Sequence, residues 1–117
     1  MIVAGLGFRS AATAQDLLAA LSLWPQRPDL LATATRKASA PAFADLARQL
    51  DLPAIGVDVA GVTTPTTSSR VEDAFFTGSL SEAAALMAAG QGAQLIQTRL
   101  VTPNGMATIA IAEGPGL

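Results

Sequence analysis

The hydrophobic pattern changes its period repeatedly along the first half of the chain. Short apolar runs at residues 2–6, 30–35 and 54–57 are typical of buried strands. The stretches between them instead carry apolar residues at helical spacing, three or four positions apart. This order of strand, helix, strand, helix and strand predicts a parallel α/β sheet, because parallel strands need a crossover connection that is usually a helix.

Hydroxyl and proline residues mark the ends of the two intervening helices. Thr13 can cap a helix that runs to about Leu23, and prolines follow shortly after it. Pro41 opens the second helix at its first turn, where the missing N–H of proline costs nothing, and Pro53 stops it. Each helix has one apolar face, so we expect both to pack on the sheet.

The second half of the chain begins with a long polar connection, residues 58–77, which is rich in threonine and serine. Connections of this length inside a compact domain are usually functional or mobile. A third helix is predicted over residues 79–89, with Gly90 ending it. Two strand-like runs follow, residues 95–101 and 106–112, and an Asn-Gly pair between them predicts a hairpin. The last strand should therefore be antiparallel to its neighbour.

These elements predict one domain over residues 1–117, with the architecture of a three-layer α/β/α sandwich. Its sheet should be mixed and mostly parallel, with about five strands, the last of them antiparallel. At 117 residues the chain is long enough to bury a substantial core. Half of the residues are apolar and only 4% are aromatic, so we expect alanine-rich helices packed closely on the sheet.

Composition excludes several kinds of chemistry. The chain has no cysteine and no histidine, so it lacks thiol catalysis, disulfides, and the commonest metal ligand and general base. A net charge of −2 gives no overall attraction to nucleic acid or to acidic membranes. No apolar run approaches the roughly 18 residues that span a bilayer, and the start lacks a basic leader. We expect a soluble, cytoplasmic protein with no nucleic-acid or membrane partner, no resident metal and no cofactor.

Basic and hydroxyl side chains cluster after the predicted strands. In parallel sheets, ligands collect beyond the carboxyl ends of the strands, and the start of a helix adds free amides and partial positive charge. The ligand-binding residues predicted on this ground, called the basic rim below, are Gly7, Arg9, Ser10, Thr35, Lys37, Thr66, Ser68, Gly78 and Ser79. Arg36 and Arg70 add charge nearby. The rim suits a multiply carboxylated or phosphorylated ligand; the alternative is a solvated rim that binds nothing, since Lys and Arg are mostly exposed in any protein.

The glycine-rich segment at residues 5–10 begins like a dinucleotide-binding fingerprint but departs from it. Ser10 stands where the third glycine belongs, and Thr35 stands where an acidic residue would hold the ribose. No P-loop sequence is present either. A nicotinamide site is therefore not expected, and the plain interpretation of the glycines is a tight turn that leaves a buried strand.

Ser79 and Glu82 allow two interpretations. Their spacing is that of a capping box, in which each side chain bonds the other residue's backbone amide. Glu82 is also a weak candidate for a general base, and a catalytic Ser79 would need a carboxylate or Lys37 as its base. The acidic residues that could form a carboxylate-only metal site, with a spacing that matches no known ligand motif, are Asp58, Glu72 and Asp73.

Several separated patches have counterparts, in the same order, in one known family. They are residues 5–10, 35–38, 46–47, 52–53, 68–71, 78–86 and 107–112. Together they resemble the family of CobE and the C-terminal domain of CbiG, which are cobalamin (corrin ring) biosynthesis proteins. The chain departs from the family pattern mildly at Leu80, where valine is frequent, and at Phe8, where cysteine is frequent. The resemblance implies a three-layer α/β/α domain and a place around the ring-contraction stage of corrin synthesis.

The family also implies a ligand. A precorrin or corrinoid intermediate carries many acetate and propionate groups, which the basic rim could receive through charge-assisted hydrogen bonds. Full-length CbiG-type proteins open a lactone on the contracted macrocycle with the help of an additional N-terminal domain, so a lactone hydrolase using Glu82 or a loop carboxylate is one alternative. A non-catalytic accessory subunit of another cobalamin-pathway enzyme is a second. A homodimer is also open.

Overall fold

The strands and helices predicted from the sequence are present in a computed structural model that describes residues 1–68 and 78–117. The elements are β1 (Ile2–Phe8), α1 (Ala14–Leu21), β2 (Leu30–Ala34), the 3₁₀ turn η1 (Thr35–Lys37), α2 (Pro41–Leu50), β3 (Ala54–Val57), α4 (Leu80–Ala89), β4 (Gln94–Val101) and β5 (Ala107–Glu113). Their bounds differ from the predicted ones by one or two residues. Residues 69–77, with Arg70, Glu72 and Asp73, lie outside the described part of the chain.

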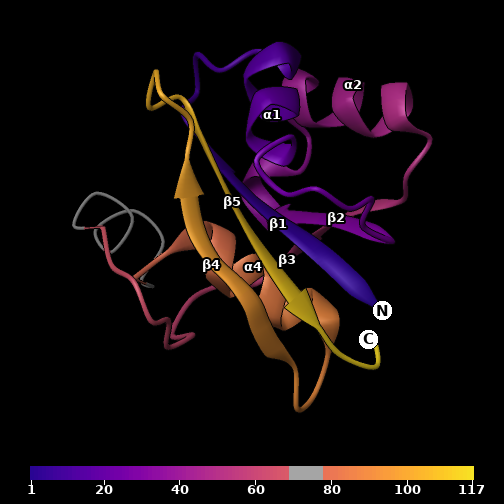
Figure 1. Cartoon of the computed structure of the whole chain (residues 1–117), viewed down its shortest axis with the longest axis vertical. Coiled ribbons are helices and arrows are strands. Elements are labelled where there is room, and N and C mark those ends of the chain that lie inside the picture. The colour runs from indigo at the N-terminus through magenta and orange to yellow at the C-terminus, as the bar shows by residue number, and fades with distance from the viewer. Residues whose placement is uncertain (69–77) are drawn as a thin grey trace.

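The strands form one mixed sheet in the order β3-β2-β1-β5-β4. The pairs β1–β2 and β2–β3 are parallel, whereas β5 is antiparallel to both of its neighbours, β1 and β4. Figure 1 shows β5 lying between β1 and β4, so β5 is an interior strand of the sheet and not an edge strand. The predicted mixed sheet with an antiparallel last strand is confirmed.

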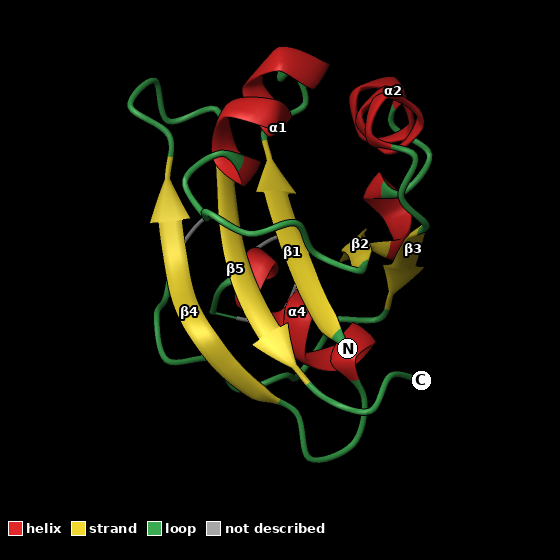
Figure 2. Cartoon of the chain, turned by 45° about the vertical axis from the view of Figure 1, so that its right-hand side comes forward, coloured by secondary structure: helices red, strands yellow, loops and turns green. Residues whose placement is uncertain are grey.

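Helices cover both faces of this sheet, as the three-layer prediction requires. Figure 2 shows α1 and α2 on one side and α4 on the other. One apolar cluster joins α1 and α2 to β1, β2 and β5, and a second cluster joins α4 to the opposite face of the same strands. Alternation along β1 explains the division, since Val3 faces α4 whereas Ala4 and Leu6 face α1 and α2.

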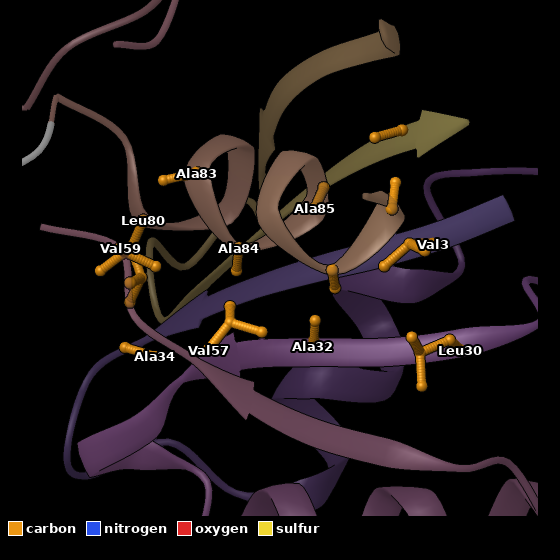
Figure 3. Close-up of a cluster of buried hydrophobic side chains, with 13 residues drawn as sticks. Val3, Leu30, Ala32, Ala34, Val57, Val59, Leu80, Ala83, Ala84 and Ala85 are labelled. Atoms are coloured by element: carbon orange, nitrogen blue, oxygen red, sulfur yellow. The ribbon is translucent and has the colours of Figure 1, made fainter. Parts of the chain in front are cut away.

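The α4 face is packed by small residues (Figure 3). At Gly5 in β1, a Cβ atom would lie 2.0 Å from the carbonyl oxygen of Ser81 and 2.6 Å from the amide nitrogen of Ala85. The helix backbone therefore rests directly on the strand, which only glycine permits. Both Gly5 and Gly7 lie inside β1 and neither has a positive φ. The interpretation of this glycine pair as a tight turn is therefore wrong: the pair leaves room for a helix.

The opposite face is packed by large side chains. Leu17 from α1 and Leu46 from α2 are fully buried against the sheet. Phe43 from α2 stacks on Phe8 at the end of β1, with ring centroids 6.3 Å apart and an interplanar angle of 13°. The stack therefore lies at the end of β1, and the Phe8 ring also contacts the Lys37 ammonium.

Candidate functional site

The residues that follow β1 and β2 meet at one edge of the sheet, because these two strands are adjacent and parallel. Arg9, Ser10 and Thr35 are exposed there, and Lys37 is half-buried. The Lys37 ammonium donates to the carbonyl oxygen of Phe8 and lies 4.6 Å from the centroid of the Phe8 ring. The structure thus brings together this half of the predicted basic rim.

Arg9 is held in place by the turn between β4 and β5. Its amide donates to the Met106 carbonyl oxygen over 3.0 Å, and its side-chain Nε donates to the Gly105 carbonyl oxygen over 3.1 Å. Within residues 1–68 and 78–117, Arg9 makes no ion pair with a carboxylate. The neutral carbonyl group of Gly105 therefore orients the guanidinium, which keeps its charge available at the rim.

The same β4–β5 turn is fastened to the start of α1 through Asn104. Its side-chain nitrogen donates to Asp16 Oδ1 over 3.0 Å, and its Oδ1 accepts from the Met106 amide over 3.1 Å. The backbone amide of Thr13, and after it the Asn104 side chain, lower the pKa of the Asp16 carboxyl below its ordinary value of 3.8. The turn that positions Arg9 is thus itself anchored to α1.

The other half of the predicted rim surrounds the start of α4. The Ser68 amide donates to the carbonyl oxygen of Gly78 over 2.6 Å. A Cβ at Gly78 would lie 2.7 Å from Thr64 Oγ1, so the polar connection is packed closely here. Ser79 caps α4, since its Oγ accepts from the Glu82 amide over 3.4 Å, and its side chain is fully buried. The capping role of Ser79 is confirmed, but its hydroxyl does not reach the surface.

Glu82 is fully buried, and both of its carboxylate oxygens accept hydrogen bonds. Oε1 accepts from the amide and the hydroxyl of Thr66, over 3.0 and 2.9 Å, and Oε2 accepts from the Arg99 amide over 2.8 Å. Among the described residues, this carboxylate bonds no amide of Ser79, so the predicted capping box has only its Ser79 half. A general base that activates water needs contact with that water, and this environment does not suit one.

Gly7 connects the two halves of the rim. A Cβ at Gly7 would lie 2.7 Å from Thr108 Oγ1 and 3.5 Å from the Leu80 Cβ. Gly7 is buried beneath the first turn of α4 and brings that turn to the end of β1. Its position is explained by packing, and the ligand contacts of the rim would come from its exposed members.

Sequence reasoning missed the partners of Glu82 and the role of Asn104. A signal for the first was available, because Glu82 is the only charged residue in a helix that is otherwise alanine, leucine, methionine and serine. A lone carboxylate in such a helix predicts burial with hydrogen-bond donors around it. Asn104 was interpreted only as a turn residue, although its side chain also bonds its surroundings.

A separate apolar pocket lies at the other end of the strands. Its volume is about 230 Å³, and its wall includes Leu21, Trp24 and Leu52. Arg27 also lines it, but one guanidinium nitrogen donates to the Leu50 carbonyl oxygen over 2.6 Å. This pocket does not suit a ligand with many carboxylates.

The described residues show neither a metal-binding cluster nor a membrane-spanning helix. In the part of the chain that the structure describes, no group of three or more Asp, Glu, His or Cys side chains could hold a metal ion. Asp58 accepts from the Ala60 amide over 3.1 Å, whereas Glu72 and Asp73 lie outside that part. Among the described helices, none has both the length and the hydrophobicity needed to cross a membrane.

Comparisons with known proteins give one consistent result. A family model described as "Cobalamin synthesis G C-terminus" matches residues 2–112. The crystal structure of CobE, a protein from the cobalamin (vitamin B12) biosynthetic pathway, superposes with a TM-score of 0.80 at 25% identity, covering 96% of this chain and 92% of that chain. The cobalamin biosynthesis protein chiG from Agrobacterium tumefaciens is 37% identical, with a TM-score of 0.72 and coverage of 97% and 98%.

A third structure is more distant. The cobalamin biosynthesis protein G homologue from Sulfolobus solfataricus is 17% identical, with a TM-score of 0.70, and the match covers 95% of this chain and 36% of that one. At this identity the likeness shows the fold alone. A search of curated proteins found no match.

Proposed function

This chain belongs to the cobalamin synthesis G C-terminus family, and we propose that it binds a polycarboxylated precorrin or corrinoid intermediate around the ring-contraction stage of corrin synthesis. The observation that carries the proposal is Arg9, an exposed guanidinium after the end of β1 that the Gly105 carbonyl group orients and no described carboxylate neutralises. Corrinoid intermediates bear carboxylates around the edge of a wide ring, and a guanidinium binds carboxylates with strong, directional hydrogen bonds.

The form of the rim also supports a wide ligand. Arg9, Ser10 and Thr35 are exposed on an open edge, and the second half of the rim lies near the start of α4. Cations and hydroxyls spread over an edge can meet several carboxylates of one macrocycle at the same time. A small anion would need only one such group.

Lactone hydrolysis is the second candidate function, and the geometry at Glu82 argues against this residue as its base. Its two oxygens accept hydrogen bonds from three donors of the described part of the chain, and it has no exposure to solvent. In a ligand-binding protein, Glu82 would need only to hold Thr66 and the Arg99 amide in place. The accessory-subunit alternative has no observation in its favour and becomes one outcome of the test.

The proposal is tested by titrating the protein with cobyrinic acid, a cobalt corrinoid with free carboxylates, and with metal-free hydrogenobyrinic acid, followed by visible absorbance. We expect saturable binding that Arg9→Ala weakens by about tenfold to a hundredfold, since one charge-assisted hydrogen bond is worth roughly 1.5–3 kcal/mol. The Arg9→Ala/Lys37→Ala double variant should bind more weakly still. Arg48→Ala is the control, because it removes the same charge from an exposed position on α2.

Failure of the wild-type protein to bind either corrinoid at high micromolar concentration would refute the proposal. The search would then turn to a protein partner, as the accessory-subunit alternative requires. Equal binding by wild type and by Arg9→Ala would instead show that corrinoids bind away from the basic rim.

A further inference from the structure

We infer that Glu82 is a positioning residue. Its buried carboxylate fastens residues 64–68, called the strap below, and strand β4 to the first turn of α4. We call these contacts of the Glu82 carboxylate with the strap and β4 the latch, and they are hydrogen bonds within the protein. Its consequence for ligand binding rests on the proposed function, because Thr66 and Ser68 belong to the strap and to the basic rim.

The carboxylate is held without any cationic side chain among the described residues. Within residues 1–68 and 78–117, three donors surround it, two from Thr66 and one from the backbone amide of Arg99. Glu82 also lies in the first turn of α4, where the positive end of the helix dipole stabilises a negative charge. Burial of a carboxylate without hydrogen-bond partners would be costly, so these donors are needed to stabilise it. The carboxylate in turn fixes the positions of the donors.

The latch closes a ring of contacts between strap and strand. The Arg99 amide donates to Glu82, and its guanidinium donates to the Thr67 carbonyl oxygen over 3.2 Å. The register of β4 against β5 shifts between Gln97 and Leu100, around Arg99. A bulge of this kind turns backbone groups away from the ladder, which here leaves an amide free to meet the carboxylate.

The strap then leads directly to the start of α4. The Thr64 hydroxyl donates to the Thr66 carbonyl oxygen over 2.8 Å, and the Ser68 amide donates to the Gly78 carbonyl oxygen. Glu82 itself has no exposed surface, so it cannot touch a ligand. Any effect of Glu82 on ligand binding must therefore pass through the strap or through β4.

Two substitutions of Glu82 distinguish the effect of its hydrogen bonds from the effect of its negative charge. Glu82→Gln keeps the shape of the side chain but replaces one carboxylate oxygen with an NH2 group. That group cannot accept a hydrogen bond, so either Thr66 or Arg99 loses its acceptor. Glu82→Asp keeps the charge but is one methylene shorter and cannot reach both sides. Glu113→Gln is the control, because it removes one exposed carboxylate at the end of β5.

Amide hydrogen exchange, measured residue by residue by NMR without ligand, decides whether the latch exists. We expect exchange at Thr66, at Arg99 or at both to rise about tenfold or more in each Glu82 variant, and to stay at wild-type values in Glu113→Gln. Unchanged protection at these two amides in Glu82→Gln would overturn the inference. If the Glu82 variants do not fold, Thr66→Val removes one of the three hydrogen bonds, and exchange across the strap should still rise.

Cobyrinic acid titration of the same variants decides whether the latch positions the site. Severalfold weaker binding by both Glu82 variants, with Glu113→Gln unchanged, supports the positioning role. Wild-type affinity in a variant whose strap exchanges faster would overturn it. Absence of binding by the wild-type protein would overturn the proposed function and this last step together, whereas the exchange experiment would still decide the latch.

Discussion

The helices on the two faces of the sheet approach it in different ways. α4 lays its backbone against β1 through Gly5 and alanine side chains, whereas α1 and α2 are held off by Leu17, Phe43 and Leu46. On the α4 face, stability depends on a close fit between backbones. On the other face it depends on the apolar area that large side chains remove from water. Substitutions should therefore destabilise the protein for opposite reasons on the two faces. On the α4 face the cause is overpacking, and on the α1 and α2 face it is the creation of a cavity.

The starts of the helices differ in the same way. α1 begins with a complete capping box, in which Thr13 and Asp16 bond each other's amides near the surface. α4 has the same spacing at Ser79 and Glu82, but Glu82 is buried and bonds the strap and β4 instead. The same Ser/Thr-x-x-Asp/Glu spacing thus gives two different structures. In α4, Thr66 and Arg99 donate to the Glu82 carboxylate, and the capping box stays incomplete.

The largest predicted effect is on the α4 face. Gly5→Ala places a methyl group 2.0 Å from the Ser81 carbonyl oxygen, so α4 must lift away from the sheet. We expect a loss of more than about 4 kcal/mol in the free energy of unfolding, measured by urea denaturation. Gly61→Ala is the control, because Gly61 has φ +77° and nothing within 4 Å of its Cβ. It should cost about 1 kcal/mol through backbone strain alone. A similar loss at both glycines would refute the close fit.

The second prediction concerns the opposite face. Phe43→Ala removes a buried ring that stacks on Phe8 and should lower the free energy of unfolding by about 3 kcal/mol. The loss comes mainly from a cavity, so Phe43→Met, whose flexible side chain refills much of that volume, should restore part of the stability. If Phe43→Met were as unstable as Phe43→Ala, the cavity explanation would fail.

The smallest predicted effect is on the pKa of Asp16, which completes the capping box at the start of α1. The Thr13 amide and the Asn104 side chain lower the pKa of Asp16, so the ionised form is favoured in the folded protein. The stabilisation that Asp16 provides is therefore present above its ordinary pKa of 3.8 and is lost as pH falls through the lowered value. A carboxyl-carbon NMR titration should give a midpoint below 3.8 for Asp16. Asn104→Ala should move it upward, and a midpoint that does not move would exclude the Asn104 contact as a cause.

Local patterns were sufficient to predict the elements and their order. Hydrophobic period, proline positions and the Asn-Gly turn predicted the α/β sandwich and the antiparallel last strand, because each depends on residues near in sequence. The glycine pair in β1 was misinterpreted, because only the helix that packs on it, some 75 residues later, explains why glycine is needed.

The candidate site was predictable only in part. The parallel pairing of β1 and β2 accounts for the shared edge of Arg9, Thr35 and Lys37, and strand order alone predicts it. The partners of Glu82 lie 16 and 17 residues away on either side. Neither those contacts nor the register shift in β4 leaves a periodic signal in the sequence.

The interior position of β5 in the sheet bears on how the chain reaches its fold. β1 pairs with β5 along its whole length, from Ile2 opposite Glu113 to Phe8 opposite Ala107. During synthesis, β1 therefore has one side unpaired until residues 107–113 have been made. Contacts between such distant residues slow folding and prolong the exposure of strand edges. Protection of this chain from aggregation should matter most in the interval before its last strand is available.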